Sequence, residues 1–259
     1  MRRVFVLLFA LCHLVAAVAQ LSPDVVLLGD SNTWLGGEDC TKPEGWNTWF
    51  KTEFAPRSCR SYARSGATWT NTPRTQRNTV AYSEVLSDDN TIYNQICRLE
   101  EAVDSGRQAK PDLIIILAGT NDAWFQKQRG WPLAMSAGEA FAEGRHISEA
   151  KDATTLATAV RLDCELLRAR YPEARIVLLT PFESVQAGAT AIRKAGDIIA
   201  DCGRKMDLDV VRLDRKSGIC AAQERANKRL TKDGTHTSVA GARQVGTLVA
   251  RELKALLNN

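Results

Sequence analysis

Short apolar runs alternate with helical patterns along this chain, and this alternation limits the folds that it can adopt. The runs are rich in Val, Ile and Leu, as is typical of strands that are buried on both faces of a sheet. They cover residues 25–30, 113–119, 175–181 and 209–214. A weaker strand candidate lies at 58–69 and ends at Gly66.

Helical patterns separate these runs. Apolar residues recur at helical spacing in 91–106, in 152–170 and from Thr237 to the end of the chain, and a further helix is expected at 188–206. A strand followed by a helix, repeated along the chain, predicts an α/β fold. We expect a mostly parallel sheet of about five strands with helices on both faces.

The N-terminus has the features of a secretory signal peptide. A basic "MRR" precedes a short apolar stretch, and "AVA" at 17–19 is a small-residue cleavage site. The apolar run is short for a bilayer, which disfavours a stable membrane anchor. We therefore expect 1–19 to be removed near Ala19 and 20–259 to form one domain. The mature protein would be exported, to the periplasm or out of the cell.

The charge of the chain argues against a nucleic-acid partner. The formal net charge is +4, and losing Arg2 and Arg3 with the signal peptide leaves +2. The basic residues are dispersed among acidic ones rather than clustered, whereas a surface that binds nucleic acid presents a basic patch.

Cysteine usage permits disulfides and disfavours a metal site. Six cysteines remain after residue 19, and an even number in an exported protein is compatible with bridges. Cys40 and Cys59 flank the segment between the first and second strands, and we predict a bridge between them. No CxxC or Cys/His cluster is present, so we expect no metal. The chain also offers no indication of a cofactor.

Polar residues follow several of the predicted strands. Ser31 follows the first strand, Gly66 the weak second one and Asn121 the third, and Asp233 and His236 precede the last helix. In a parallel sheet the ligand site lies beyond the carboxyl ends of the strands. If the predicted fold is correct, these residues share one rim.

Their chemistry matches acyl transfer. A serine hydroxyl becomes a nucleophile when a base takes its proton, and His236 with Asp233 three residues before it supplies a base and its orienting carboxylate. The Ser31 and Gly66 backbone N–H groups and the Asn121 side-chain amide are candidate donors to the oxyanion. Each residue alone is more often a turn or cap residue, and the joint pattern carries the hypothesis.

Four short blocks carry a resemblance to a known family. "GDSN" around Ser31, "SGAT" around Gly66, "GTND" around Asn121 and "DGTH" ending at His236 resemble the blocks of the SGNH (GDSL-type) hydrolases. The likeness spans about residues 24–257, and the first block departs by carrying Asn32 where many members have leucine. The Gly-x-Ser-x-Gly elbow of the α/β-hydrolases is absent around Ser31.

The resemblance implies a flavodoxin-like three-layer α/β/α fold and a serine esterase. Ser31 would be the nucleophile, His236 the base and Asp233 its orienting partner. The Ser31 N–H, the Gly66 N–H and the Asn121 amide would form the oxyanion hole.

Three tryptophans suggest a substrate. Trp34, Trp69 and Trp124 each follow a proposed catalytic residue by three positions, and exposed indoles form flat platforms that suit sugar rings. The alternative is that indoles pack behind the loops, which we expect for at least one of them. The irregular segment 123–150, which contains His146, is a candidate lid or substrate wall.

We therefore predict hydrolysis of short acyl esters, acetyl above all, on a carbohydrate. One alternative is a lipase, lysophospholipase or thioesterase acting on longer acyl chains. The other is a non-catalytic sugar-binding module with the same fold. Sequence does not indicate the oligomeric state.

Overall fold

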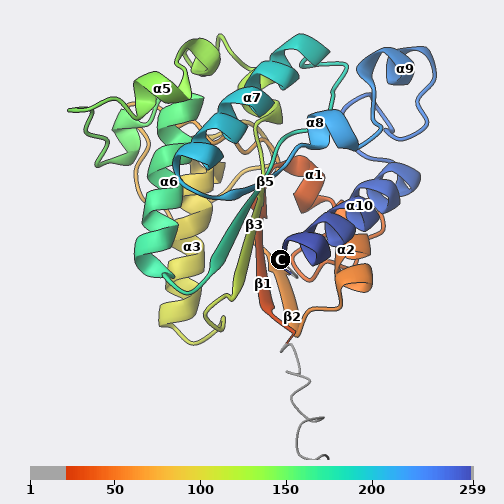
Figure 1. The fold of residues 1–259 in the computed structure, drawn as a ribbon, viewed down its shortest axis with the longest axis horizontal. Helices are drawn as coiled ribbons and strands as arrows, with labels where there is room; N and C mark the ends of the chain where they lie inside the picture. The colour runs from red at the N-terminus through yellow and green to blue at the C-terminus, as the bar shows by residue number, and fades with distance from the viewer. Residues whose placement is uncertain (1–21, 258–259) are drawn as a thin grey trace, which may run out of the picture.

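The computed structural model describes residues 22–257, and a five-stranded sheet lies at its centre (Figure 1). All neighbouring strands run parallel, in the order β2-β1-β3-β4-β5. The strands are β1 (Asp24–Gly29), β2 (Ser58–Ser61), β3 (Leu113–Leu117), β4 (Arg175–Leu179) and β5 (Asp209–Val211). The predicted α/β fold with about five strands is confirmed, and the sheet is wholly rather than mostly parallel.

Helices connect and cover these strands. The longer helices are α2 (Trp46–Phe54), α3 (Ile92–Asp104), α6 (Leu156–Arg170), α7 (Ala189–Lys205) and α10 (Val239–Leu257). The short helices are α1 (Ser31–Trp34), α4 (Thr120–Trp124), α5 (Ala137–Ala140), α8 (Leu213–Lys216) and α9 (Ala221–Ala226). Single 3₁₀ turns are η1 (Asp88–Asn90), η2 (Pro132–Ala134) and η3 (Ala150–Asp152).

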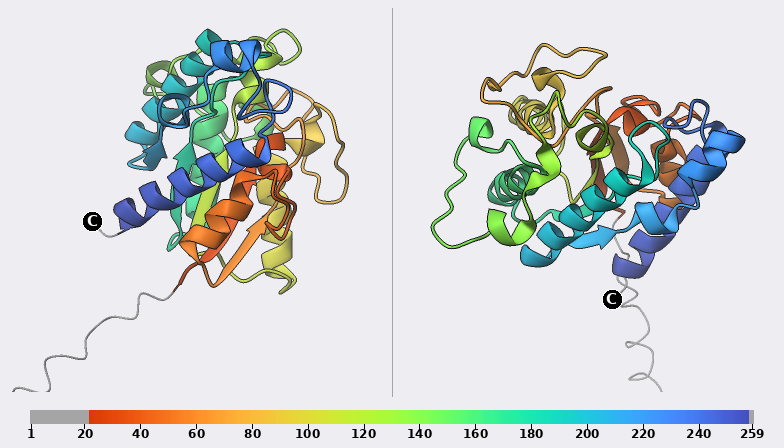
Figure 2. Two further views of the ribbon diagram at one scale, coloured as in Figure 1. Left: turned by 90° about the vertical axis from the view of Figure 1, so that its right-hand side faces the viewer. Right: turned by 90° about the horizontal axis from the view of Figure 1, so that it is seen from above.

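The helices form two layers, one on each face of the sheet. Successive strand side chains point to opposite faces, so one set packs against α3, α6 and α7, and the other against α2 and α10. Figures 1 and 2 show α2 and α10 side by side on their face. Every residue of β1 and β3 is buried, which explains the continuous apolar runs. The three-layer α/β/α prediction is confirmed.

The edge strand β2 is shorter than predicted. Only Ser58–Ser61 forms a strand, and its partly exposed pattern explains the weak apolar signal. Beyond it the chain still follows β1, because the Tyr62 N–H donates to the Leu27 carbonyl at 2.8 Å and the Arg64 N–H to the Gly29 carbonyl at 3.1 Å. Gly66 therefore lies beyond the end of β2, in a turn that follows the strand.

Helix α2 was not predicted from the sequence. Its buried anchors are Trp46 and Phe50, one helical turn apart, and they pack against α10. Gly246 of α10 makes the close approach feasible, because a Cβ there would lie 2.3 Å from the Trp46 carbonyl oxygen. Two large side chains in nine residues give too short a pattern to identify a helix from periodicity.

The segment 123–150, predicted as an irregular lid or substrate wall, is partly helical and partly buried in the core. It contains part of α4, then η2 and α5, and Leu133, Ala137 and Ala140 are buried in the core beside α6 and α7. Trp131 stays exposed at its surface, and so does His146.

Two further predictions concern the cysteines and the N-terminus. The predicted Cys40–Cys59 bridge is not formed: both thiols are free and buried, with their Sγ atoms 3.7 Å apart. The predicted signal peptide, residues 1–19, lies outside the described residues. Across 22–257, none of the helices combines the length and the apolar character needed to span a membrane.

Candidate active site

The direction in which successive strands are added to the sheet reverses between β1 and β3. The chain passes from β1 to β2 at one edge, returns to β3 on the other side of β1, and continues to β4 and β5. Such a switch point leaves a crevice beyond the carboxyl ends of the two central strands. The turn after β1 carries Ser31, and the turn after β3 carries Asn121.

Ser31 is held at the end of β1 by a tight turn. Gly29 packs against β3, where a Cβ would lie 2.5 Å from the Leu117 carbonyl oxygen, so glycine is required there. Asp30 then caps α1 by accepting a hydrogen bond from the Asn32 N–H at 3.0 Å. Ser31 therefore begins a short helix directly above the sheet.

The His236 ring bridges Ser31 and Asp233. Ser31 Oγ lies 3.0 Å from His236 Nε2, although the two residues are 205 positions apart. On the other side of the ring, His236 Nδ1 lies 2.6 Å from Asp233 Oδ2. These distances are those of a serine, a base and a carboxylate in hydrogen-bond contact, as nucleophilic catalysis requires.

Asp233 is oriented by its own loop. Its Oδ1 accepts hydrogen bonds from the backbone N–H groups of Thr235 and His236, at 2.9 and 2.8 Å. Burial raises the pKa of Asp233, but these bonds and the His236 ring outweigh burial, and the pKa lies below its ordinary value. The carboxylate therefore stays ionised and can accept a hydrogen bond from the Nδ1–H group of His236.

The histidine loop is anchored from two directions. On one side, the Thr237 N–H donates to Asn32 Oδ1 at 3.2 Å, and Thr237 Oγ1 donates to the Glu44 carbonyl at 2.7 Å. On the other, the buried Glu224 carboxylate accepts the backbone N–H groups of residues 229–231. Sequence reasoning missed Glu224, because nothing local marks a helical glutamate as buried.

Asn121 and Gly66 lie on facing turns. The Asn121 side-chain amide donates to the Ala67 carbonyl at 2.8 Å, which places it beside the Gly66 turn. Gly66 has φ +69°, and a Cβ there would lie 2.4 Å from the backbone carbon of Val85. Glycine is thus needed for the backbone conformation and for the close packing of the Val85 segment.

Asp122 ties these two turns together. Its carboxylate is fully buried and accepts the Trp69 N–H at 3.1 Å, the Thr70 N–H at 3.0 Å and the Thr70 hydroxyl at 2.7 Å. Burial raises its pKa, and these hydrogen bonds oppose the shift. Both residues of the Asn-Asp pair after β3 therefore hold the neighbouring turn: Asn121 binds the Ala67 carbonyl, and Asp122 binds the backbone of Trp69 and Thr70.

Two buried amides connect the serine turn to the Gly66 turn. Gln95 of α3 accepts the Gly29 N–H at 2.8 Å and donates to the Gly29 carbonyl at 2.9 Å. It also donates to the Asn90 carbonyl, and Asn90 Nδ2 donates to the Ser65 carbonyl at 2.7 Å. Sequence reasoning missed both residues, because polar residues near a helix start look like exposed ones.

The three predicted platform tryptophans differ in exposure. Trp69 is completely buried in the core beside Ile92, so its predicted role as a surface platform is wrong. The Trp69 N–H donates to the completely buried Asp122 carboxylate, which holds this part of the backbone inside the protein. Trp34 is half-buried, and Trp124 is 38% exposed and stacks on Phe125 with ring centroids 4.8 Å apart.

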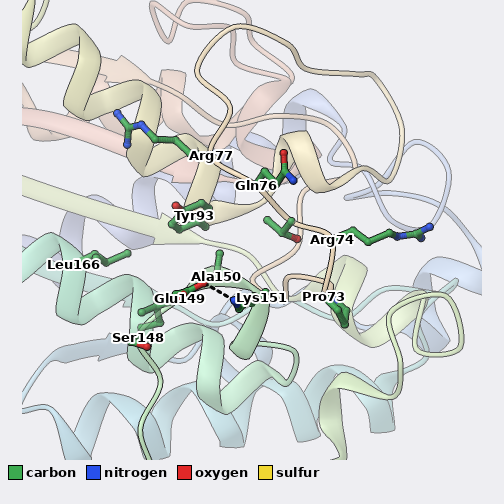
Figure 3. Close-up of a pocket in the computed structure, with 12 residues that line it drawn as sticks. Pro73, Arg74, Gln76, Arg77, Tyr93, Ser148, Glu149, Ala150, Lys151 and Leu166 are labelled. Atoms are coloured by element: carbon green, nitrogen blue, oxygen red, sulfur yellow. Dashed lines mark ion pairs between the residues drawn. The ribbon is translucent and has the colours of Figure 1, made fainter.

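No cluster of three or more His, Cys, Asp or Glu side chains with metal-binding geometry occurs among residues 22–257. A cavity of about 470 Å³ lies between the 73–77 segment and the 148–151 segment, away from the residues described above (Figure 3). Lys151 and Glu149 form an ion pair at its wall, with a separation of 2.8 Å.

Comparison with known proteins gives a family match and several similar folds. The model of the GDSL-like lipase/acylhydrolase family matches residues 27–244. A "possible lipase" from Chitinophaga pinensis superposes with a TM-score of 0.60 at 18% identity, covering 92% of this chain and 100% of that chain.

Two further solved structures are similar. A lipase/acylhydrolase from Enterococcus faecalis gives a TM-score of 0.53 at 19% identity, covering 90% of this chain and 96% of that one. An acetyl xylan esterase gives 0.54 at 17% identity, covering 90% and 99%. At these identities the likeness establishes the fold alone. No curated protein matches the sequence.

Proposed function

Because the chain belongs to the GDSL-like lipase/acylhydrolase family, and is therefore a carboxylic ester hydrolase, we propose that Ser31, His236 and Asp233 carry its chemistry. The single observation that supports this most is the 3.0 Å separation of Ser31 Oγ and His236 Nε2. Few other arrangements would bring a serine and a histidine so far apart in sequence into contact at a switch point.

The proposed reaction has two stages. Ser31 Oγ attacks the ester carbonyl carbon while His236 Nε2 takes the hydroxyl proton. The tetrahedral intermediate then collapses, the bond to the alcohol oxygen breaks, and His236 returns the proton to the leaving alcohol. His236 next deprotonates a water molecule, which attacks the acyl-Ser31 ester. The bond between the acyl carbon and Ser31 Oγ then breaks, the carboxylic acid leaves, and His236 returns the proton to Ser31 Oγ. Asp233 holds the ring tautomer and stabilises the imidazolium.

The charge that develops on the carbonyl oxygen needs donors that are already in place. We assign this role to the backbone N–H groups of Ser31 and Gly66 and to the Asn121 amide. Asn121 uses one amide hydrogen on the Ala67 carbonyl, and its second hydrogen is available to the oxyanion. The buried Asp122 and Asn90 contacts hold these turns before substrate arrives.

We further propose that the substrate is a short acyl ester, acetyl above all, on a carbohydrate. Trp34 and Trp124 retain exposed indole surface and follow Ser31 and Asn121, so they support a sugar ring near the reacting ester. An acetyl xylan esterase is among the proteins that share this fold. Export through residues 1–19 would bring the enzyme to extracellular or periplasmic polysaccharides.

A panel of esters tests the substrate. Acetylated polysaccharides and p-nitrophenyl esters from acetate to palmitate are compared by kcat/KM, with Ser31→Ala as the blank. The proposal predicts the highest values on acetyl esters and a loss of activity on acetylated glycans in a Trp124→Ala variant. Higher kcat/KM on the long chains would instead favour a lipase, the function named for the relatives from Chitinophaga pinensis and Enterococcus faecalis.

A further inference from the structure

Two buried arginines share a small cavity at the edge of the sheet. Arg64 follows β2 and Arg98 belongs to α3, and each residue is only 7% exposed. The cavity has a volume of about 170 Å³, which is several times the volume of one water molecule. Arg60 and Arg107 also line it, so four arginines border the space.

Several guanidinium donors in this place have no acceptor. Arg64 Nη1 donates to the Ala63 carbonyl and Nη2 to Glu38 Oε1, each at 3.0 Å, but its Nε has no partner. Arg98 Nη2 donates to the carbonyls of Ala81 and Asp89, and both its Nε and Nη1 lack partners. Leaving the donors of a buried charged group unsatisfied is costly, so an acceptor that approached these two guanidinium groups would stabilise them.

The acidic residues nearby do not balance these charges. Glu38 pairs with Arg64 at 3.0 Å and with Arg60 at 3.6 Å, and Glu101 pairs with Arg107 at 3.3 Å. Arg98 makes no ion pair with any of the described residues 22–257. Burial lowers the pKa of Arg98, the nearby Arg64 charge adds to the effect, and the Asp89 carboxylate opposes it without outweighing the other two. The cavity therefore has an excess of positive charge, with two buried arginines at its inner wall and exposed residues at its rim.

We propose that this cavity is a binding site for a small oxoanion, with Arg64 and Arg98 as its principal donors. A carboxylate, sulfate or phosphate group presents several acceptor oxygens, which match the planar, fork-like donors of arginine. The source is either a free inorganic anion or the carboxylate of an acidic sugar, and both share this chemistry.

The site is built from three parts of the fold. Besides the ends of β2 and α3, it includes the 79–82 segment, where Tyr82 stacks over the Arg64 guanidinium at 4.2 Å. The same segment continues to Val85, whose backbone packs against Gly66. A bound anion would thus hold together the edge strand, α3 and the segment beside the proposed oxyanion hole.

The larger cavity in Figure 3 lacks these features. Its Lys151 is already paired with Glu149, and its Arg77 donates to Glu100 at 2.9 Å. None of its lining side chains is among the described buried groups that lack a hydrogen-bond partner. Unsatisfied buried donors therefore single out the smaller cavity.

Isothermal titration calorimetry tests this site on the intact chain. Sodium phosphate, sulfate and glucuronate are titrated separately, with sodium chloride keeping the ionic strength constant. We expect saturable binding at one site per chain, and an Arg98→Met variant should bind about tenfold more weakly or worse. The Ser31→Ala variant should bind as the unmodified protein does, which separates this site from the proposed catalytic one.

Substitutions at exposed positions keep the test valid if the Arg98→Met variant does not fold. Arg107→Ala removes a rim cation and should weaken binding several-fold, whereas Arg204→Ala, an exposed arginine of α7 that lines none of this cavity, should leave it unchanged. Tighter binding of glucuronate than of phosphate and sulfate would support an acidic sugar, and the reverse order a free anion. Absence of saturable binding by all three, or equal binding by Arg107→Ala and the unmodified protein, would overturn the proposal.

Discussion

Asn32 and Thr237 are joined by a hydrogen bond of 3.2 Å from the Thr237 backbone N–H to Asn32 Oδ1, across 205 positions of the chain. Asn32 follows Ser31 and Thr237 follows His236, so the bond holds the histidine loop against the serine turn. Both residues are almost completely buried, so water could not take the place of either partner if this bond were removed.

Replacing Asn32 by leucine tests this contact. Asn32→Leu leaves the Thr237 N–H without an acceptor and lets the His236 loop shift, so we expect kcat to fall about tenfold, equivalent to ~1.4 kcal/mol, with little change in KM. The matched control is Asn227→Leu, at an exposed asparagine whose side chain takes part in none of the hydrogen bonds described for the site, and it should keep full activity. Equal kcat in both variants would show that the bond does not position His236.

The central sheet could be predicted from sequence, because burial on both faces leaves a direct record in the residue types. Residues 114–116 are three consecutive isoleucines, which is typical of a strand that is buried on both faces. The residues beyond each strand could be predicted for the same reason: once the strands are placed, a parallel sheet brings their carboxyl ends to one edge.

Side-chain direction and long-range contacts could not be predicted. Trp34 and Trp69 have the same offset from a proposed catalytic residue, yet only Trp69 is completely buried, because Asp122 binds the backbone beside it. Asn90 and Gln95 are polar residues that bind backbone groups far away in sequence, and such partners leave no local pattern. The buried arginines of the cavity were missed for the same reason.

Asn121 is expected to act on the transition state rather than on substrate binding. Asn121→Ala should lower kcat by roughly a hundredfold, since one oxyanion donor contributes about 3 kcal/mol. Steady-state kinetics on a p-nitrophenyl ester measures the effect. Asn94→Ala removes another buried asparagine, whose amide binds the carbonyls of Gln76 and Asp88, and should lower stability while leaving kcat near its normal value. An unchanged kcat in Asn121→Ala would remove that residue from the oxyanion hole.

Gly66 and Gly106 form a matched pair for testing the oxyanion turn. Both have positive φ, +69° and +73°, but a Cβ at Gly106 would meet nothing within 4 Å, whereas at Gly66 it would meet the Val85 backbone. Gly106→Ala should cost only the conformational penalty, about 1 kcal/mol, in urea unfolding. Gly66→Ala should cost more and also lower kcat. Equal losses of stability, with activity retained, would contradict the close packing of Val85 on Gly66.

Asp163 is expected to make stability depend on pH. This residue of α6 is fully buried, neither carboxylate oxygen has a partner, and burial, with the Asp122 charge, raises its pKa well above the ordinary value. A carboxyl with a raised folded-state pKa stabilises the protein fully below the unfolded pKa of 3.8, and that contribution is lost as pH rises toward the folded pKa.

The Asp163→Asn variant cannot ionise and escapes this loss. Its free energy of unfolding relative to the unmodified protein should therefore grow with pH, by about 1.4 kcal/mol per pH unit within that window. Urea unfolding across the window, from just above pH 4 upward, measures the difference. A difference that stays constant with pH would mean that Asp163 does not titrate on unfolding.

The central claim is that Ser31 is the nucleophile, and labelling with a fluorophosphonate tests it most directly. Intact-mass spectrometry should find one phosphonyl adduct on the unmodified protein and none on Ser31→Ala, and that variant should have lost ester hydrolysis. Its unfolding transition should stay close to normal, because Ser31 is a small residue at a turn. Adduct formation or ester hydrolysis retained by a pure Ser31→Ala sample would contradict the account.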